Sequence, residues 1–186
     1  FGFNGGSELV VSNESAAIAV SQVFLNTNMA AAGGVVAAII TSLVLTGKMD
    51  VTMAMNGAIA GLVSITASPS APSAGIALLI GAAGGALVYF SILYFDKRLK
   101  LDDPVGAISA HGIVGILGVM VVPFTSDASF IWQAIGVISI SGFSFFASLG
   151  TILLINNFMP IRASDEEQDV GLDLSEIGVE AYPDFK

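Results

Sequence analysis

Residues 102–122 read DDPVGAISAHGIVGILGVMVV, an apolar run that follows Pro104 and contains His111, the only histidine of the chain. About 20 helical residues at 1.5 Å each cross a hydrocarbon core of about 30 Å, so this run can span a membrane. His111 is expected to lie about 10 Å from the start of the span. Ionisable groups at such depth usually face a bundle interior or a water-filled path, where they relay protons or bind substrate. The alternative is a neutral imidazole that only donates to a carbonyl of a neighbouring helix.

The composition of the whole chain is that of a membrane protein. Of its 186 residues, 54% are hydrophobic and 11% are charged, whereas soluble domains carry about 25% charged residues. The apolar runs at residues 15–47, 51–95, 104–126 and 128–161 are too long for buried core helices, and they lack the alternation of barrel strands. We therefore expect an all-α integral membrane protein in a lipid bilayer. The chain has no cysteine, so disulfides and thiolate metal sites are excluded, and no cofactor is expected.

The chain is expected to form five full transmembrane helices, preceded by the end of another. The opening residues FGFNGGSELVVSNES have neither an initiating methionine nor the basic start of a signal peptide, and they read as the end of a helix that begins outside this chain. The full helices are expected at residues 16–45, 53–66, 75–95, 104–124 and 130–159. Gly47, the prolines and serines of residues 67–75, and Pro160 are expected to end them.

The basic residues predict the orientation in the membrane. Those that follow the first, third and fifth full helices are Lys48, Lys97, Arg98, Lys100 and Arg162, and the intervening loops at residues 8–14, 68–73 and 125–129 contain none. Because basic loops remain in the cytoplasm, we expect a transmembrane domain at residues 1–161 and a cytoplasmic tail at residues 162–186. The expected location is the cell membrane. The tail has eight acidic residues against two basic ones, which is −6 of the net charge of −9. No basic patch indicates nucleic-acid binding.

Small residues recur at near-helical spacing along the predicted spans. They include Gly57, Gly61, Gly81, Gly85, Gly112, Gly115 and Gly118. Small faces of this kind allow helices to pack closely in lipid. They predict a compact bundle around His111.

Five segments resemble, in order, the motifs of ammonium transporters of the Amt/Mep/Rh family. FGFNGGS (1–7) resembles W-F-G-F-N-x-G-S, and LNTNMAAAGG (25–34) resembles N-T-x-x-A-A-A. NGAIAGLVSIT (56–66) resembles N-G-x-L-A-G-L-V-x-I-T, and DDPVGAISAHGIVGILG (102–118) resembles D-D-x-x-D-V-F-G-V-H-G-x-x-G-I-x-G. GLDLSEIGVEAY (171–182) resembles G-L-D-x-S-E-H-G-E-x-A-Y. The resemblance covers nearly the whole chain.

This resemblance implies an eleven-helix homotrimer with one pore per subunit, built from two inverted repeats. The chain would hold the second repeat. Phe3 matches an inner gate phenylalanine, Ser7 a vestibule hydroxyl, Thr66 a pore-side threonine and His111 the second of two pore histidines. Gly106 departs from the pattern, because the family has an acid there. The implied function is ammonium and ammonia transport, in which ammonium is recruited at an outer vestibule and deprotonated, and ammonia crosses a hydrophobic pore.

The chemistry of these side chains suits that function. An aromatic face and a hydroxyl lone pair attract a small cation, whereas a charged group enters hydrocarbon only at high cost. An imidazole both donates and accepts, and it can carry a proton. Each role has an alternative: Phe3 could be a packing residue, Ser7 an exposed loop hydroxyl, and Thr66 could bond back to its own helix.

The tail is expected to form an ordered strap against the membrane domain. Ser175 and Tyr182 lie in it as candidate regulatory residues, and phosphorylation of Ser175 would add roughly −1.5 to −2 charge among existing acids. The resemblance suggests a contact with the neighbouring subunit and a cytoplasmic regulatory partner of the PII type. A transport-inactive ammonium sensor on the same fold is the alternative function, and a permease for another small neutral solute is a third. An enzyme is not expected, because no nucleophile and base pair is present in the spans.

Overall fold

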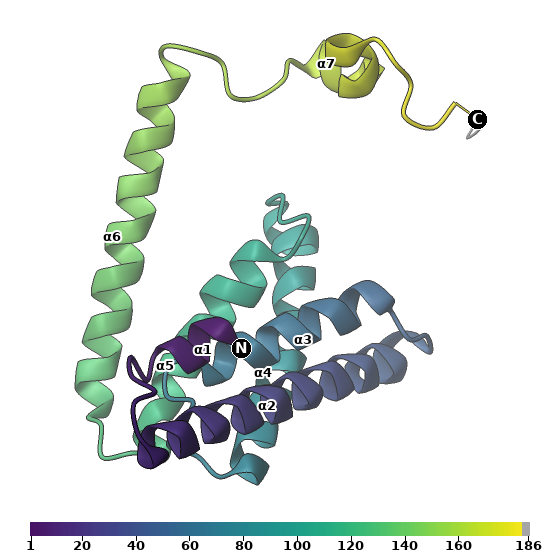
Figure 1. Cartoon of the computed structure of the whole chain (residues 1–186). Coiled ribbons are helices and arrows are strands. Elements are labelled where there is room, and N and C mark those ends of the chain that lie inside the picture. Colours follow the sequence, from purple (N-terminus) through teal and green to yellow (C-terminus); the bar gives the residue numbers. More distant parts are fainter. Residues whose placement is uncertain (184–186) are drawn as a thin grey trace. The chain divides into compact units, whose positions relative to one another are not determined.

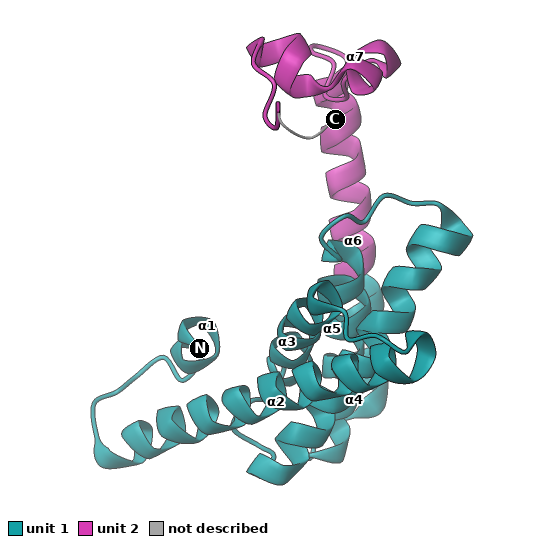
Figure 2. Cartoon of the chain, turned by 90° about the vertical axis from the view of Figure 1, so that its right-hand side faces the viewer, with its two compact units in different colours: residues 1–139 teal, residues 140–186 magenta. Residues whose placement is uncertain are grey.

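The computed structural model describes residues 1–183, and these form helices and loops with no strand, as the all-α prediction requires. The chain divides into two compact units, residues 1–139 and 140–186 (Figure 2). The boundary predicted at residue 161 between membrane domain and tail stays a prediction. The helices are α1 (Gly2–Gly6), α2 (Glu14–Thr46), α3 (Val51–Ile65), α4 (Ala74–Tyr94), the π-turn η1 (Phe95–Leu99), the π-turn η2 (Ile108–Ile113), α5 (Val114–Val121), the 3₁₀ turn η3 (Val122–Phe124), α6 (Phe130–Asn156), α7 (Asp165–Val170) and the π-turn η4 (Asp173–Ile177).

Polar residues at the ends of the long helices fix where these helices begin and stop. Asn13 starts α2, and its side chain accepts a hydrogen bond of 2.9 Å from the backbone amide three residues later. Asp50 caps α3 in the same way at 3.1 Å, and Ser73 caps α4. Gly47 ends α2 in a left-handed conformation with φ 71°, as glycine does most easily. The predicted stop at Gly47 is confirmed.

Within residues 1–183, three helices are long and apolar enough to cross a membrane. They are Glu14–Thr46, Ala74–Leu99 and Phe130–Asn156. The helices Val51–Ile65 and Ile108–Phe124 are apolar but shorter than the about 20 residues that a straight span needs. The chain is thus an integral membrane protein by composition and helix length, and the count of five full spans stays a prediction.

Glycines bring three helices of the first unit into backbone contact. α3 and α4 both pack against α2 (Figure 1). A Cβ atom at Gly34 of α2 would overlap the carbonyl oxygen of Gly57 and lie 3.0 Å from the nitrogen of Gly61, both in α3. A Cβ atom at Gly85 of α4 would overlap the backbone of Gly34. Such contacts leave no room for any side chain.

The prediction of close packing holds for most of the glycines but not for two of them. Besides Gly57, Gly61 and Gly85, it is confirmed for Gly81, which lies against the backbone of Ala30, and for Gly118, whose Cβ atom would lie 2.8 Å from the carbonyl oxygen of Ser64. It is wrong for Gly112 and Gly115, where a Cβ atom would meet nothing closer than 3.9 and 3.8 Å. These neighbours are side-chain atoms at ordinary contact distance, Ile108 Cγ2 for Gly112 and Val63 Cγ1 for Gly115, and not the backbone of another helix. Gly115 also borders a pocket.

The described part of the tail, in the second unit, is ordered by its own hydrogen bonds. Ser164 and Glu167 form a capping box at the start of α7, and these bonds lower the pKa of the Glu167 carboxyl. Asp173 accepts hydrogen bonds from the backbone amides of Ala181 (2.8 Å) and Leu174 (3.0 Å). The bond from Ala181, the larger cause, lowers the pKa of Asp173. These contacts fold residues 173–181 into a loop.

The candidate regulatory residues lie in and beside that loop. Ser175 is an exposed residue of η4, and Tyr182 is exposed directly after the loop. Residues 184–186, which include one of the eight predicted tail acids, lie outside the described residues. The packing of the tail against the membrane domain, and its contact with a neighbouring subunit, stay predictions.

Candidate functional site

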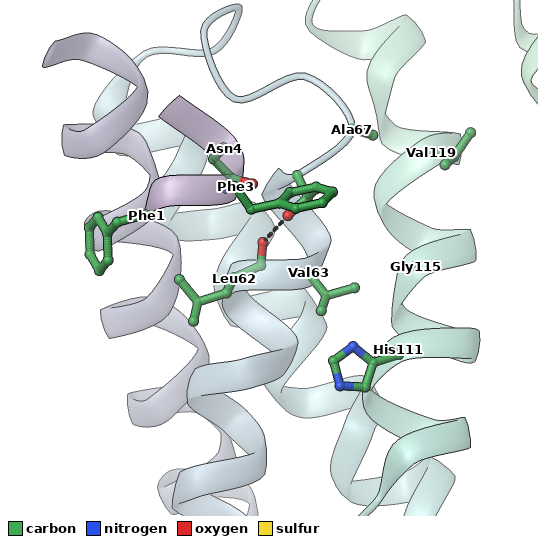
Figure 3. A pocket seen from close by; sticks show the side chains of 10 residues that line it. Phe1, Phe3, Asn4, Leu62, Val63, Ala67, His111, Gly115 and Val119 are labelled. Carbon is green, nitrogen blue, oxygen red and sulfur yellow. Dashed lines mark hydrogen bonds between the residues drawn. The ribbon is translucent and has the colours of Figure 1, made fainter. Parts of the chain in front are cut away.

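One pocket of about 610 Å³ lies in the first unit, between α1, the C-terminal end of α3, and the helical segment that carries His111 (Figure 3). Its volume falls within the usual range of small-molecule sites. Its walls are mostly apolar. The lining residues are Phe1, Phe3, Asn4, Leu62, Val63, Thr66, Ala67, His111, Gly115 and Val119. The pocket therefore joins three of the sequence motifs that are far apart along the chain.

His111 projects into this pocket from the π-turn η2 (Figure 3). π-turns are rare and occur often at functional sites. Among residues 1–183, no group forms a hydrogen bond with the imidazole, and the side chain is exposed. The alternative in which His111 donates to a carbonyl of a neighbouring helix thus has no counterpart in the described chain.

The helical segment of His111 begins later than the sequence predicts. Helical structure starts beside Ile108 and not directly after Pro104, because the Asp103 carboxylate accepts hydrogen bonds from the backbone amides of Ile108 (3.0 Å) and Ser109 (3.1 Å). The predicted depth of His111 is counted along a helix from Pro104, and residues 104–106 are not helical, so the depth itself stays a prediction. Asp103 fixes the start of the turn that presents the imidazole.

Phe3 and Thr66 lie on the same pocket as His111. The Phe3 side chain is 81% exposed, and its ring extends across the end of α3 (Figure 3). The Thr66 hydroxyl donates to the Leu62 carbonyl oxygen at 2.7 Å, which is the bond back to its own helix that the sequence left open. After this donation the Thr66 oxygen keeps acceptor capacity toward the pocket.

Ser7 is the one predicted substrate-binding residue that does not line the pocket. It lies directly after α1, is exposed, and its hydroxyl donates to the Phe3 carbonyl oxygen at 3.2 Å. The structure therefore brings Phe3, Thr66 and His111 together and leaves Ser7 beside them. The bond to Phe3 links Ser7 to the same short helix that carries the ring.

Sequence reasoning missed two polar residues of the site. Asn4 lines the pocket, is 3% exposed, and donates to the Thr27 hydroxyl oxygen of α2 at 3.1 Å. Asp103 positions η2, as described above. Asp103 could have been found, because an acid shortly before an apolar helical run is a helix-start signal. The Asn4 contact could not, because its partner is 23 residues away.

The site offers few polar groups and no metal-binding cluster. Within residues 1–183, no group of three or more histidine, cysteine or acidic side chains could hold a metal ion. A charged solute in an apolar pocket must be compensated by hydrogen bonds or opposite charge. For that purpose the pocket has the two aromatic rings of Phe1 and Phe3, the Thr66 hydroxyl oxygen, the Asn4 amide and the His111 imidazole, and no carboxylate. It suits a small cation at its edge and a small neutral solute inside.

Comparison with known proteins agrees with this chemistry. The chain is 32% identical to the "Ammonium transporter" of Bacillus subtilis over 200 residues, covering 99% of this chain and 48% of that protein. It is 34% identical to "Ammonium transporter Amt2" of Archaeoglobus fulgidus over 206 residues, covering all of this chain and 43% of that protein. The chain thus spans less than half the length of these two relatives.

Solved structures give the same answer for the fold. A protein described as "Sensor Amt Protein" superposes with a TM-score of 0.85 at 34% identity, covering 94% of this chain and 45% of that one. Mep2 of Candida albicans has the same fold with a TM-score of 0.79 at 24% identity, covering 89% of this chain and 40% of that one. The sequence model of the Ammonium Transporter Family matches residues 1–182. This match over almost the whole length shows that the chain belongs to the Ammonium Transporter Family.

Proposed function

We propose that the chain forms part of a path that carries ammonium and ammonia across a membrane, with His111 as the polar group of its narrow apolar part. The observation that carries the proposal is the meeting of Phe3, Thr66 and His111 on one pocket, in a chain of this family. An aromatic ring, a lone pair and an imidazole are the groups that a small N–H solute needs.

In the proposed path, Phe3 and Thr66 act before His111. An ammonium ion near the Phe3 ring gains about 0.5–2 kcal/mol from the aromatic face and donates to the Thr66 oxygen. It cannot pass farther with its charge, because nothing with negative charge lines the pocket. The neutral imidazole of His111 has one donor and one acceptor nitrogen. The ammonium ion gives a proton to the acceptor nitrogen, and the imidazole releases its other proton from the donor nitrogen. Neutral ammonia remains, and it can exchange hydrogen bonds with the imidazole.

The charge distribution supports an orientation with the Phe3 end outward. Thr66 follows the C-terminal end of α3, whereas Lys48 lies in the turn before the N-terminal end of that helix. Lys97 and Arg98 lie in η1, beyond the far end of α4. We propose that the basic end is cytoplasmic, that Ser7 belongs to an outer vestibule, and that the tail lies in the cytoplasm. A homotrimer, and a regulatory partner of the PII type for the tail, are proposed on the family resemblance alone.

The test is uptake of radiolabelled methylammonium, or ammonium-dependent current, by the full-length protein at equal surface expression. His111→Ala removes the imidazole, and we expect uptake to fall about 100-fold or more, as loss of a proton-transfer group typically costs. Gly112→Ala is the matched control, because a Cβ atom there has no neighbour within 3.9 Å. Uptake at the wild-type rate in His111→Ala would contradict the proposed role.

A transport-inactive sensor is a second candidate, favoured by the match to "Sensor Amt Protein" at 34% identity. A sensor would bind ammonium without carrying it. Isothermal titration of the detergent-solubilised protein, run beside the uptake assay, separates the two functions. Binding without uptake in the wild type would favour the sensor, and uptake that depends on His111 would favour the transporter.

A further inference from the structure

Two successive polar side chains of α2, Asn26 and Thr27, are completely buried. Both are 0% exposed, in a helix that is otherwise largely apolar. A buried amide or hydroxyl costs free energy unless it forms hydrogen bonds. The partners of these two residues therefore indicate what each side chain does.

Thr27 holds the short helix α1. Its hydroxyl oxygen accepts the hydrogen bond of 3.1 Å from the Asn4 amide. Phe24 lies one turn earlier on the same face of α2 and packs against Gly5. Its ring also meets the Phe1 ring edge to face, with 6.0 Å between the ring centroids. These contacts join α1 to one face of α2.

Asn26 holds the loop between α3 and α4. Its side-chain nitrogen donates to the carbonyl oxygens of Pro69 (2.8 Å) and Pro72 (2.7 Å), which uses both amide hydrogens. Its side-chain oxygen accepts from the Gln22 amide at 2.9 Å. Proline lacks a backbone donor, so a loop with two prolines has fewer groups to satisfy its own carbonyls. Asn26 supplies two of the missing donors.

The two contacts hold two segments that border the pocket. Successive residues of a helix point about 100° apart, so Asn26 and Thr27 reach different neighbours from one turn of α2. α1 carries Phe3, and the loop follows Thr66 and Ala67, all of which line the pocket (Figure 3). We infer that Asn26 and Thr27 are positioning residues that set the distance between Phe3 and Thr66, and thereby the capture of substrate. This inference rests on the proposed function.

His111, the residue proposed to act after capture, is positioned independently of Asn26 and Thr27. His111 lies on η2, whose start is fixed by the Asp103 carboxylate and not by α2. A change at Thr27 should thus leave the imidazole in place and disturb the Phe3 side of the pocket. Substrate capture, measured as the apparent KM, should change more than the maximal rate.

The experiment compares three variants of the full-length protein. Thr27→Val keeps the shape and removes the acceptor, and Thr27→Ser keeps the hydroxyl. Thr41→Val is the matched control, because the Thr41 hydroxyl bonds only to the Ala37 carbonyl of its own helix at 2.7 Å. For Thr27→Val we expect the apparent KM for methylammonium to rise about three- to tenfold, as loss of one hydrogen bond implies. The maximal rate should stay within about twofold, and both Thr27→Ser and Thr41→Val should match the wild type.

Amide hydrogen exchange tests the two contacts without any transport. Thr27→Val should speed exchange in residues 5–9 and not in residues 68–73, whereas Asn26→Ala should do the reverse. Equal changes in both segments, an unchanged KM in Thr27→Val, or a Thr41→Val that behaves like Thr27→Val would overturn the inference. A wild type without uptake would overturn the proposed function and the capture role with it, and exchange would then still decide whether the two residues hold the two segments.

Discussion

Gly106→Ala should destabilise the protein strongly, because two separate effects act at this residue. Gly106 has φ 67°, and an alanine in this left-handed region costs about 1–2 kcal/mol. The added Cβ atom would also lie 2.6 Å from Asn56 Oδ1 and 3.2 Å from Ile92 Cδ1. Overlap of this kind in a packed interior costs about 1–3 kcal/mol. We expect a total loss of about 2–5 kcal/mol in the free energy of unfolding.

A second substitution separates the two effects. Asn56 Oδ1 is buried, and no hydrogen-bond partner exists for it in the described part of the chain. Replacing Asn56 by alanine opens space for a Cβ atom at residue 106 but leaves the backbone conformation unchanged. In the background of Asn56→Ala, Gly106→Ala should therefore cost mainly the backbone part, about 1–2 kcal/mol, because the remaining contact with Ile92 Cδ1 at 3.2 Å needs only a small shift of that side-chain end.

The assay is chemical unfolding in detergent micelles, followed by tryptophan fluorescence or by retention on a sizing column. Gly112→Ala is the control, since alanine fits there and favours helix by about 1 kcal/mol over glycine. If Gly106→Ala unfolded at the same denaturant concentration as the wild type, both the left-handed turn and the contact with Asn56 would be refuted. An equal cost with and without Asn56 would refute the contact alone.

Three further changes have defined outcomes. Asp103→Ala removes the acceptor of two backbone amides, so it should cost about 0.5–2 kcal/mol and lower methylammonium uptake, whereas a variant with full stability and uptake would show that the cap is dispensable. The pKa of Asp173 is lowered, so its hydrogen bond from the Ala181 amide is fully present above pH 3.8, the ordinary pKa of an aspartate, and is lost as pH falls through the folded-state pKa. In NMR spectra the amide resonance of Ala181 should move as pH falls below 3.8. In Asp173→Asn it should stay fixed. Ser175→Asp adds charge beside acidic residues and should change uptake without changing the oligomeric state, which a sizing column measures. Unchanged uptake, together with rapid proteolysis of the wild-type tail, would show that the tail is only a solubilising extension.

Local sequence signals predicted the helices well, because the features that set them are local. The stop at Gly47 and the break at residues 67–73 follow from residues that dictate their own backbone conformation. The joining of Phe3, Thr66 and His111 was expected from the family resemblance, and the three residues do share a pocket. The hydrophobic periodicity of the sequence alone could not have predicted that these three residues lie close together.

What the sequence could not show depends on contacts between distant segments. Asn26 reaches carbonyl groups 43 and 46 residues away, and no spacing rule connects them. Gly112 and Gly115 have the same pattern as the glycines that pack tightly, but a Cβ atom at either would meet only side-chain atoms at ordinary contact distance, since the pattern does not say which side of a helix lies against another backbone. The late start of the helical segment of His111 is different, because it follows from local bonds of the Asp103 carboxylate to residues five and six positions later, a helix-start signal that the sequence does carry.

The backbone contacts at Gly34 have a consequence for how the proposed ammonium path can open. α2, α3 and α4 touch there without a layer of side chains between them, so one helix cannot slide on another without main-chain collision. We expect these three helices to move as a rigid frame. The Phe3 ring, which is largely free of packing against this chain, can turn within that frame, and exposed side chains turn in picoseconds to nanoseconds. If the path opens by rotation of this ring and not by movement of helices, opening is fast. The transport rate is then limited by the dehydration of ammonium and by the loss of its proton.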